Sequence, residues 1–512
     1  MSSLIKADSL EIREYQQKIA ESVKRKNSLV VLPTGMGKTL IAVLVAVDRL
    51  ERFPDSKILI TAPTRPLNAQ HKKSFEKFTK LNPEEIILVT GKIPPIEREK
   101  LYKTARIIIA TPQTIENDLE NGRISLENFS FVTFDEAHRS VKEYSYTLIA
   151  RKYKEQAKHP LILGLTASPG GTLEKIEEIK KNLFIESVEI RTETEEDVKK
   201  YVKEIVKDWL YIDLPEDFKL IRTLFEEVLK NDLYWLKDHH FTTTYKPNKT
   251  QLLMLQKRLA QRYHEGGRNF SLMWVMIRSA EAIKLLHAME LLETQGISPL
   301  YEYLKRLEAS KKNTDKRLFK DPRMRDAFAR VQELYKQGIE HPKLEALKNL
   351  VKEFLREKKN VKIIVFANYR STVDKIDKVL KAEGIKSEIL IGQTMKEGRG
   401  MTQEQQIETL KLFAAEEFNV MVGSSISEEG LDVPAVDYAI FYDAVPSEIR
   451  AIQRRGRVGR QTAGKIIFII TKDTRDEAYF HVALHKEKKM KSILYEMQEN
   501  SKKKKILKDW IG

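Results

Sequence analysis

Short apolar runs recur through the first part of the chain, and segments with apolar residues at helical spacing separate them. The runs are rich in Ile, Val and Leu, and turn residues bound most of them. Such runs, alternating with helices, are typical of a parallel sheet covered by helices on both faces. We therefore predict an α/β domain over residues 1–192. Its expected strands lie at residues 28–32, 57–61, 86–89, 106–110, 129–134 and 161–165.

The spacing of apolar positions changes after residue 192. Between residues 193 and 340 they mostly recur at intervals of three and four, as in 220–229, and strand-like runs such as 209–214 are few. This predicts a mainly helical domain. The earlier alternation then resumes and predicts a second α/β domain over residues 341–490, followed by a basic tail over 491–512. The later apolar runs lie at residues 361–366, 387–391, 419–422, 438–442 and 465–470.

A glycine-containing loop lies between the first expected strand and the helix that follows it. Gly35 and Gly37 lack a Cβ, so backbone N–H groups can approach phosphate oxygens there. Lys38 can reach the β and γ phosphates of ATP, and the Thr39 hydroxyl can ligate Mg²⁺. The generic phosphate-loop pattern has Gly at position 32, where this chain has Leu. The predicted ATP-binding residues are Pro33, Thr34, Gly35, Met36, Gly37, Lys38 and Thr39.

An acidic pair, Asp135 and Glu136, directly follows the expected strand at 129–134. Two unpaired carboxylates at the end of a buried strand are costly. With a magnesium ion the arrangement is explained: Asp135 holds the metal, and Glu136 orients or deprotonates the attacking water. The alternative is an Asp-Glu pair on the surface. Upstream, Arg13 and Gln16 are candidates for binding adenine, because a Gln amide matches its donor and acceptor edge.

These elements belong to an ordered set of motifs, from Gln16 to Arg460, that resembles the superfamily-two helicases and translocases. The set comprises Gln16 and residues 33–39, 62–65, 111–112, 135–138, 166–168, 365–370, 424–434 and 453–460. Within that superfamily the chain is most similar to the archaeal Hef and Fanconi anaemia M-type branch, on residues 134–139, 291–296, 392–393, 401–403 and 428–434. The resemblance implies an α/β fold class, with two RecA-like parallel-sheet motor domains and a mainly helical insert between them.

The resemblance also implies roles for residues of the second motor domain. Arg457 and Arg460 would act as arginine fingers on the γ-phosphate when the motor domains close, a role that suits a planar, always charged group. Gln453 would lie near the phosphates, and Gly430 and Asp432 near the ribose. The residues that would couple hydrolysis to movement between the domains are His138, Thr166 and Ser168.

A nucleic-acid track across both motor domains follows from the same resemblance. Hydroxyls, amides and Arg suit phosphate oxygens, so we expect salt-dependent binding that is largely independent of sequence. The expected contacts are Thr64, Arg65, Thr111, Asn368, Tyr369, Arg370, Gln393 and Ser424. The family's fifth motif usually reads Ala-Thr-Ser, and Ser424 replaces its Thr here, so we expect retained activity with altered coupling.

The helical insert resembles the family module that grips duplex or branched DNA. Candidate contacts there are Lys311, Lys312, Lys316 and Arg317, and a solvated helical face is the alternative. Lys and Arg number 90 and Asp and Glu 74, which gives a net charge of +16. This charge suits a polyanionic partner, although a basic surface alone would also explain it.

The sequence contains no cysteine. This excludes disulfides, thiolate zinc sites and cysteine nucleophiles, and it suits a cytoplasmic protein. No apolar run is long enough to span a bilayer, so no membrane association is predicted. At the end of the chain, Leu507, Trp510 and Ile511 have the spacing of a sliding-clamp peptide, without its leading Gln and second aromatic residue. The alternative is a helix end that docks on its own protein.

The sequence favours an ATP-dependent DNA helicase or translocase that acts on forked or branched DNA in replication-fork repair. A duplex-RNA-dependent ATPase of the same superfamily is the first alternative. A non-catalytic nucleic-acid-binding scaffold is the second, and the intact set of Lys38, Asp135, Glu136, Arg457 and Arg460 argues against it. No Glu-Arg-Lys-x-x-x-Asp nuclease motif occurs, so strand cleavage is not predicted. The oligomeric state is left open.

Overall fold

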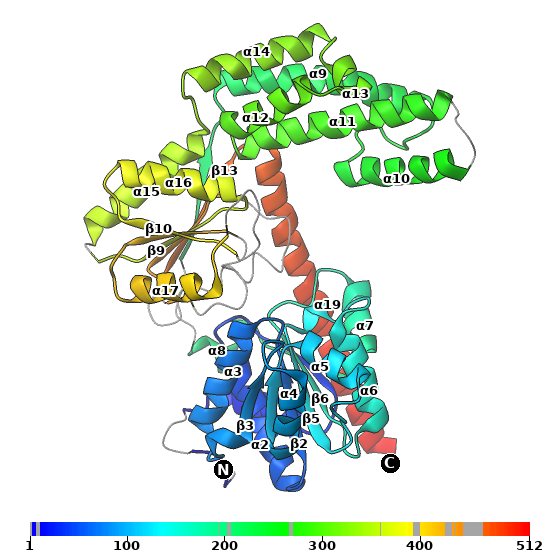
Figure 1. Cartoon of the computed structure of the whole chain (residues 1–512), viewed down its shortest axis with the longest axis vertical. Coiled ribbons are helices and arrows are strands. Elements are labelled where there is room, and N and C mark those ends of the chain that lie inside the picture. Colours follow the sequence, from blue (N-terminus) through cyan, green and yellow to red (C-terminus); the bar gives the residue numbers. More distant parts are fainter. Residues whose placement is uncertain are drawn as a thin grey trace.

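The computed structural model describes residues 3–6, 11–193, 195–201, 206–265, 270–358, 360–392, 400–424, 433–434, 436–443 and 464–511, with the side chains of all but 263–265, 270 and 500–511. These residues form two parallel-sheet domains and a helical domain (Figure 1). The predicted fold class is therefore confirmed.

The first domain is built on a seven-stranded parallel sheet. Its strand order is β3 (Ile86–Val89), β4 (Ile107–Ala110), β2 (Lys57–Thr61), β5 (Phe129–Asp135), β6 (Ile162–Thr166), β1 (Ser28–Val31) and β7 (Ser187–Ile190). Successive side chains of a strand point to opposite faces. In β1, Leu29 and Val31 belong to one apolar core and Val30 to the other, so helices cover both faces.

Two sets of helices supply these two cores. The helices α1 (Glu14–Val23), α2 (Lys38–Arg52) and α3 (Arg65–Phe78) pack on the face of Val30. The helices α4 (Pro95–Thr104), α5 (Pro112–Glu120), α6 (Ser145–Gln156) and α7 (Leu173–Asn182) pack on the face of Leu29. A short 3-10 turn, η3 (Ala137–Arg139), follows β5, and η2 (Pro83–Glu85) precedes β3. The helix α8 (Glu196–Lys199) lies against α1 at the end of the domain.

The second domain has a six-stranded parallel sheet. Its order is β10 (Ser387–Leu390), β11 (Val420–Gly423), β9 (Ile363–Phe366), β12 (Tyr438–Phe441), β13 (Lys465–Thr471) and β8 (Val206–Ile212). The helices α15 (Pro342–Glu357) and α16 (Arg370–Ala382) cover one face, and α17 (Gln403–Ala414) packs on the other. The described strands and helices follow the predicted alternation closely.

Strand β8 differs from the prediction for residues 193–340. It was expected within the mainly helical domain, yet it pairs with β13 over seven residues and forms the edge of the second sheet. Its first four residues are exposed, as suits an edge strand that has only one neighbour. The chain therefore contributes one strand to the second sheet before it enters the helical domain.

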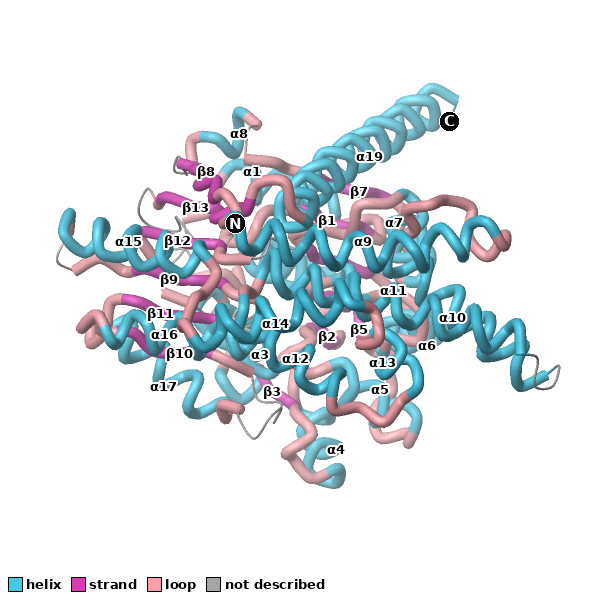
Figure 2. Tube along the Cα trace, turned by 90° about the horizontal axis from the view of Figure 1, so that it is seen from above, coloured by secondary structure: helices cyan, strands magenta, loops and turns pink. Residues whose placement is uncertain are grey.

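The helical domain comprises α9 (Glu216–Asp238), α10 (Lys249–Glu265), α11 (Phe270–Thr294), α12 (Ile297–Glu308), α13 (Asn313–Leu318) and α14 (Pro322–Lys336). They share one apolar core, which includes Phe218, Phe225, Leu292 and Val331. Seen from above, α10 projects from the rest of the domain (Figure 2). The predicted mainly helical domain between the two sheet domains is confirmed.

The last helix, α19 (Arg475–Ile511), connects all three domains. It begins beside β13 and α11 and then passes along β7 of the first domain, on the path drawn in red in Figure 1. Met490 and Leu494 are buried in the core of the first domain. The predicted basic tail at 491–512 is thus the end of a long helix. The first turns of this tail dock on the protein itself. Among the described residues, no helix has the length and apolarity needed to cross a membrane.

Candidate functional site

The predicted catalytic residues of the first domain lie together at one edge of its sheet. Strands β5, β6 and β1 are neighbours, and all are parallel. Val31 pairs with Thr166, and Asp135 pairs with Leu165, so the three strands end level with one another. The phosphate loop, Asp135 and Thr166 therefore emerge side by side, at the carboxyl edge where open α/β sheets bind ligands.

The phosphate loop has the left-handed backbone conformation that its glycines allow. Gly35 and Gly37 have φ of 86° and 74°, and Gly37 caps the first turn of α2. Lys38 and Thr39 open that helix, where the positive end of the helix dipole favours an anion. The ammonium group of Lys38 donates to the carbonyl oxygens of Leu32 at 3.0 Å and Pro33 at 3.4 Å. It is thus folded against its own loop.

Gln16 holds the phosphate loop from helix α1. Its Nε2 donates to the carbonyl oxygen of Met36 at 3.2 Å, and its Oε1 accepts from the backbone N–H of Arg13 at 3.0 Å. The hydroxyl of Tyr15 donates to the same Met36 oxygen at 2.8 Å. A Cβ on Gly37 would lie 2.2 Å from Nε2 of Gln16. Gln16 therefore supports the loop, in addition to its predicted contact with adenine.

Asp135 is buried at the end of β5 and has a histidine partner. Nε2 of His71, on α3, lies 2.9 Å from Oδ2 of Asp135, and the N–H of Glu136 donates to Oδ1 at 2.9 Å. Burial opposes ionisation of Asp135, but the hydrogen bond with His71 and the charge of Lys38 hold its pKa below the usual value. The carboxylate is therefore ionised, as a metal ligand requires.

Glu136 adopts a left-handed backbone conformation, with φ of 50°. Such a conformation is unusual for a residue other than glycine and is common at active sites. Its Oε2 lies 3.3 Å from Nδ1 of His138 but accepts no hydrogen bond of good geometry within the described structure. A carboxylate oxygen with this spare capacity suits a group that orients or deprotonates water.

The three predicted coupling residues form a chain of contacts that starts at Glu136. Nδ1 of His138 lies 3.2 Å from the hydroxyl of Thr166, which donates to the carbonyl oxygen of Ser168 at 3.0 Å. The hydroxyl of Ser168 in turn donates to Sδ of Met490 at 2.9 Å. The structure thus brings the predicted residues together and extends them to helix α19.

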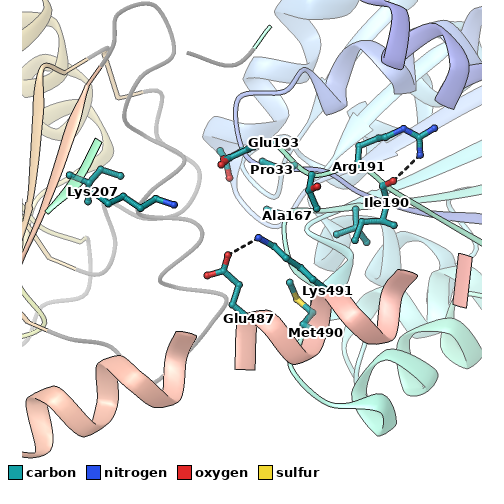
Figure 3. Close-up of a pocket in the computed structure, with 13 residues that line it drawn as sticks. Pro33, Ala167, Ile190, Arg191, Glu193, Lys207, Glu487, Met490 and Lys491 are labelled. Atoms are coloured by element: carbon teal, nitrogen blue, oxygen red, sulfur yellow. Dashed lines mark hydrogen bonds and ion pairs between the residues drawn. The ribbon is translucent and has the colours of Figure 1, made fainter. Parts of the chain in front are cut away.

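A pocket beside the phosphate loop separates the two sheet domains (Figure 3). Pro33 and Ala167 line it from the first domain and Lys207 of β8 from the second. Glu487, Met490 and Lys491 form its α19 wall, where Glu487 and Lys491 make an ion pair of 3.0 Å. The loop therefore lines a pocket to which the second sheet domain and α19 also contribute residues.

The predicted nucleic-acid contacts mostly lie where helices begin at the carboxyl edges of the two sheets. Thr64 and Thr111 precede α3 and α5, and Tyr369 precedes α16. Arg65 is exposed, whereas Arg370 donates from Nη2 to the carbonyl oxygen of Gly392 at 3.1 Å. Ser424 is buried at the end of β11.

In the helical domain the structure separates the four candidate contacts. Lys311, Lys312 and Lys316 are exposed. Arg317 instead turns inward, with its guanidinium 4.8 Å from the centre of the Trp274 ring and 3.4 Å from Glu281. Arg317 thus makes contacts within the helical domain, and its role as a DNA contact stays a prediction.

Several predicted residues lie outside the described part of the chain. They are Gln393, Gly430, Asp432, Gln453, Arg457 and Arg460, together with the side chains of Leu507, Trp510 and Ile511.

Three family models match successive parts of the chain. "DEAD/DEAH box helicase" matches residues 13–176, "Putative ATP-dependent RNA helicase, helical bundle" matches 217–339, and "Helicase conserved C-terminal domain" matches 342–462. The crystal structure of the Hef helicase domain of Pyrococcus furiosus is 45% identical, with a TM-score of 0.74, and the match covers 93% of this chain and 99% of that one. The chain belongs to the Hef-type helicases.

Curated relatives of this Hef-type chain carry two kinds of name. A "Putative ATP-dependent RNA helicase" of Methanocaldococcus jannaschii is 45% identical, and the match covers 96% of this chain and 62% of the relative. ATP-dependent DNA helicases of Neurospora crassa and Schizosaccharomyces pombe are 33% and 32% identical, each over 91% of this chain and over 42% and 57% of the relatives. The chain thus spans 42% to 62% of the lengths of these relatives.

Sequence reasoning missed several residues that contact the predicted site residues of this Hef-type chain or connect its domains. His71 contacts Asp135 from 64 positions away, and Met490 contacts Ser168 from 322 positions away. Neither lies in a recognisable motif. Gln295 was noticed only as part of a family signature, yet it reaches Asp443 in the second sheet domain. Nothing in the sequence around these residues identifies their partners.

Proposed function

We propose that this chain is a DNA-stimulated ATP hydrolase that uses ATP to translocate on, unwind or remodel forked or branched DNA in replication-fork repair. The first sheet domain binds ATP, the helical domain grips the nucleic acid, and the second sheet domain supplies Gln453, Arg457 and Arg460. The observation that carries the proposal is the contact chain from Glu136 through His138 and Thr166 to Ser168. This chain supports the proposal, because it links the proposed hydrolytic group through intermediate side chains to Met490 of α19, a helix that also contacts the other two domains.

The residues at the loop fit both ATP and magnesium. The left-handed glycines and the helix start leave N–H groups for phosphate oxygens. Asp135 is an ionised carboxylate, and Thr39 follows Lys38 on the same turn. Bound Mg²⁺ would neutralise phosphate charge. Among the described residues, no group of three His, Asp or Glu side chains forms a metal site. Two protein ligands suit magnesium, which usually keeps several waters and phosphate oxygens.

Each residue of the site has a distinct task in hydrolysis. Lys38 moves from the loop carbonyls to the phosphates when ATP is present. Glu136 orients the attacking water and takes its proton, because Oε2 has spare acceptor capacity. His71 keeps Asp135 ionised and fixed in position. Arg457 and Arg460 stabilise the charge that develops on the γ-phosphate.

We favour DNA over RNA as the substrate because of the names of the relatives. The fungal relatives are named DNA helicases, and the match with each covers 91% of this chain. The M. jannaschii relative and the helical-bundle family carry RNA helicase names, which keeps duplex RNA as the alternative. The three exposed lysines of the helical domain support a grip on phosphates, which DNA and RNA share.

The decisive experiment measures ATP hydrolysis with forked DNA, single-stranded DNA, linear duplex DNA and duplex RNA. We expect the largest stimulation with forked DNA and none in the Lys38→Ala variant. Stronger stimulation by duplex RNA would replace the DNA assignment with the RNA alternative. Activity that survives in Lys38→Ala would contradict the proposed ATP site.

We also propose that the end of α19 binds a sliding clamp in the cytoplasm through Leu507, Trp510 and Ile511. The helical backbone continues to Ile511, and its last turns extend beyond the sheet domains in Figure 2. One helical turn can present an aliphatic and an aromatic residue together. Deletion of residues 504–512 should abolish clamp binding without affecting ATP hydrolysis, and unchanged clamp binding would refute the proposal.

A further inference from the structure

The segment from Leu291 to Gly296, at the end of α11, is a family signature whose function the ATP site does not explain. It lies where the helical domain meets the second sheet domain. Glu293 and Gln295 are almost fully buried there, at 3% and 5% exposure, although both side chains are polar. Buried polar groups require partners, so the contacts of this segment indicate what it does.

Gln295 joins two elements of the second sheet domain. Its Nε2 donates to Oδ1 of Asp443 at 3.0 Å, and its Oε1 accepts a hydrogen bond from the hydroxyl of Thr372 on α16. Asp443 follows β12 and is itself 2% exposed. Both ends of the Gln295 amide are therefore satisfied by groups outside the helical domain, and loss of the amide would leave a buried carboxylate oxygen without this donor.

Asp443 carries the connection onward to the predicted nucleic-acid track. Its Oδ2 accepts the backbone N–H of Asn368 at 2.6 Å. Asn368 lies in the loop between β9 and α16, and Tyr369 and Arg370 follow it directly. Strands β9 and β12 are neighbours, so this loop and Asp443 lie at the same edge of the sheet. One carboxylate thus links the helical domain to the start of the track.

Close contacts hold the backbone around Gln295 in place. Gly296 has φ of 91°, and a Cβ there would lie 2.8 Å from Cβ of His341, so only glycine permits this close approach. Nε2 of His341 donates to the carbonyl oxygen of Glu293 at 2.9 Å. Burial lowers the pKa of His341 to about 3, so the ring is neutral. Glu293 Oε2 accepts the backbone N–H of Arg475 at 3.0 Å, which fixes the start of α19.

We propose that Gln295 is a positioning residue that couples the helical domain to the nucleic-acid track. Through Asp443 it sets the orientation of the loop at residues 368–370. The second sheet domain then holds the DNA in a fixed position relative to the DNA that the helical domain grips. The inference rests on the proposed function, because it requires nucleic acid on both domains. It adds a path by which the grip of the helical domain reaches the track.

The test compares Gln295→Ala with Ser298→Ala. Ser298 also bridges the helical domain and the second sheet domain, but its hydroxyl bonds to Glu340 at 2.7 Å and Lys375 at 3.1 Å, on a route that bypasses Asp443. Both variants thus remove a polar contact at one interface, and only Gln295→Ala cuts the path to the track. The readouts are the DNA concentration that half-saturates ATPase stimulation, the basal ATPase rate, and amide hydrogen exchange at residues 368–372.

We expect Gln295→Ala to raise the half-saturating DNA concentration by about tenfold, since losing one partner of a buried carboxylate has effects of this order. The basal rate should not change, and exchange at residues 368–372 should accelerate. Ser298→Ala should shift the half-saturating concentration less than about twofold, as expected for a partly exposed contact. Equal effects of the two variants, an unchanged half-saturating concentration, or an equal fall in basal rate would overturn the proposal.

A second pair of variants tests the proposal if Gln295→Ala fails to fold. Thr372→Val removes the hydroxyl that donates to Gln295, whereas Thr372→Ser keeps it. Thr372→Val should reproduce the rise in half-saturating DNA concentration, and Thr372→Ser should restore the wild-type value. If the wild type shows no stimulation by DNA, the proposed function fails. The exchange measurement without DNA still tests whether Gln295 positions residues 368–372, and unchanged exchange would then refute that role.

Discussion

The hydroxyl of Ser168 donates a hydrogen bond to Sδ of Met490 at 2.9 Å, although 322 positions separate the two residues. Ser168 ends the contact chain that begins at Glu136, and Met490 lies on α19. That helix starts at Arg475, whose N–H donates to Glu293 of the helical domain. A single helix therefore runs from the end of α11 in the helical domain to Ser168, the last residue of the contact chain that begins at the proposed catalytic carboxylate of Glu136.

Truncation of Met490 should release α19 from the first sheet domain. Met490→Ala leaves a cavity in a packed core, and such changes cost about 2–5 kcal/mol. We expect faster amide hydrogen exchange over residues 486–498. Met490→Leu keeps most of the volume and should cost less than about 1.5 kcal/mol. Val482→Ala, at a position 43% exposed on the same helix, is the control, and an equal effect there would disprove a specific anchor.

Substitution of Gly37 should weaken nucleotide binding. In Gly37→Ala the new Cβ would lie 2.2 Å from Gln16, and the residue would have to keep φ of 74°. Strain of this kind costs about 1–3 kcal/mol, so the affinity for a non-hydrolysable ATP analogue should fall by about tenfold or more in calorimetric titration. Gly91→Ala is the matched control, since no atom lies within 4 Å of its Cβ position. Equal affinities of the two variants would contradict the loop geometry.

Glu281 should make the helical domain less stable as pH rises. Burial and the nearby charge of Asp232 raise its pKa from 4.5 to about 7. Because the folded-state pKa lies above the unfolded value, the contribution to stability is full below about pH 4.5 and is lost as pH rises to about 7. Glu281→Gln mimics the protonated form.

The Glu281→Gln variant should therefore be more stable than the wild type at pH 8, by up to about 3 kcal/mol, and scarcely different at pH 4.5. Calorimetric melting at both pH values measures this. Glu302→Gln, at an exposed position on α12, is the control and should show no such difference. A stability gain that does not depend on pH would show that ionisation of Glu281 is not the cause.

The exposed lysines of the helical domain should determine the salt dependence of DNA binding. Substitution of Lys311, Lys312 and Lys316 by Ala should reduce the slope of log affinity against log salt by up to about 3, one for each phosphate that is no longer neutralised. Arg317→Ala should instead destabilise the domain, because its guanidinium contacts Glu281 and Trp274.

The control for charge alone is a triple substitution of Arg151, Lys152 and Lys154 by Ala. These residues are exposed at the end of α6, which leads into β6, so they lie at the sheet edge away from the predicted track. Fluorescence anisotropy at several salt concentrations measures both variants. An equal change of slope in the two would show that net charge, and not the lysines of the helical domain, governs binding.

The clustering of the candidate ATP-site residues in the first domain was predictable because they follow buried strands directly. Lys38 and Asp135 each come after an apolar run, and parallel strands bring their carboxyl ends together. The fold class followed from the same alternation. Strand β8 did not, because β13, which pairs with it, lies more than 250 positions later and the surrounding sequence is helical.

The remaining site residues depend on tertiary contacts that no local pattern encodes. Gln295 and Asp443 are 148 positions apart, and nothing near either residue identifies the other. The internal contacts of Arg317 could not be predicted for a different reason. Neighbouring residues on a helix point about 100° apart, so Lys316 faces solvent while Arg317 turns toward Glu281 and Trp274. A basic run predicts charge, but only the packing decides which side of the helix it faces.

Hydrolysis at Asp135 and Glu136 should drive movement along DNA. A synthetic fork with homologous arms and labelled strands tests this, because it reports strand separation and fork regression together. Wild-type protein should rearrange the fork only with ATP, whereas Glu136→Gln should bind ATP and the fork but leave the labelled strands in place. Rearrangement by Glu136→Gln, or rapid ATP hydrolysis by the wild type with no rearranged product, would contradict the proposed coupling of hydrolysis to movement.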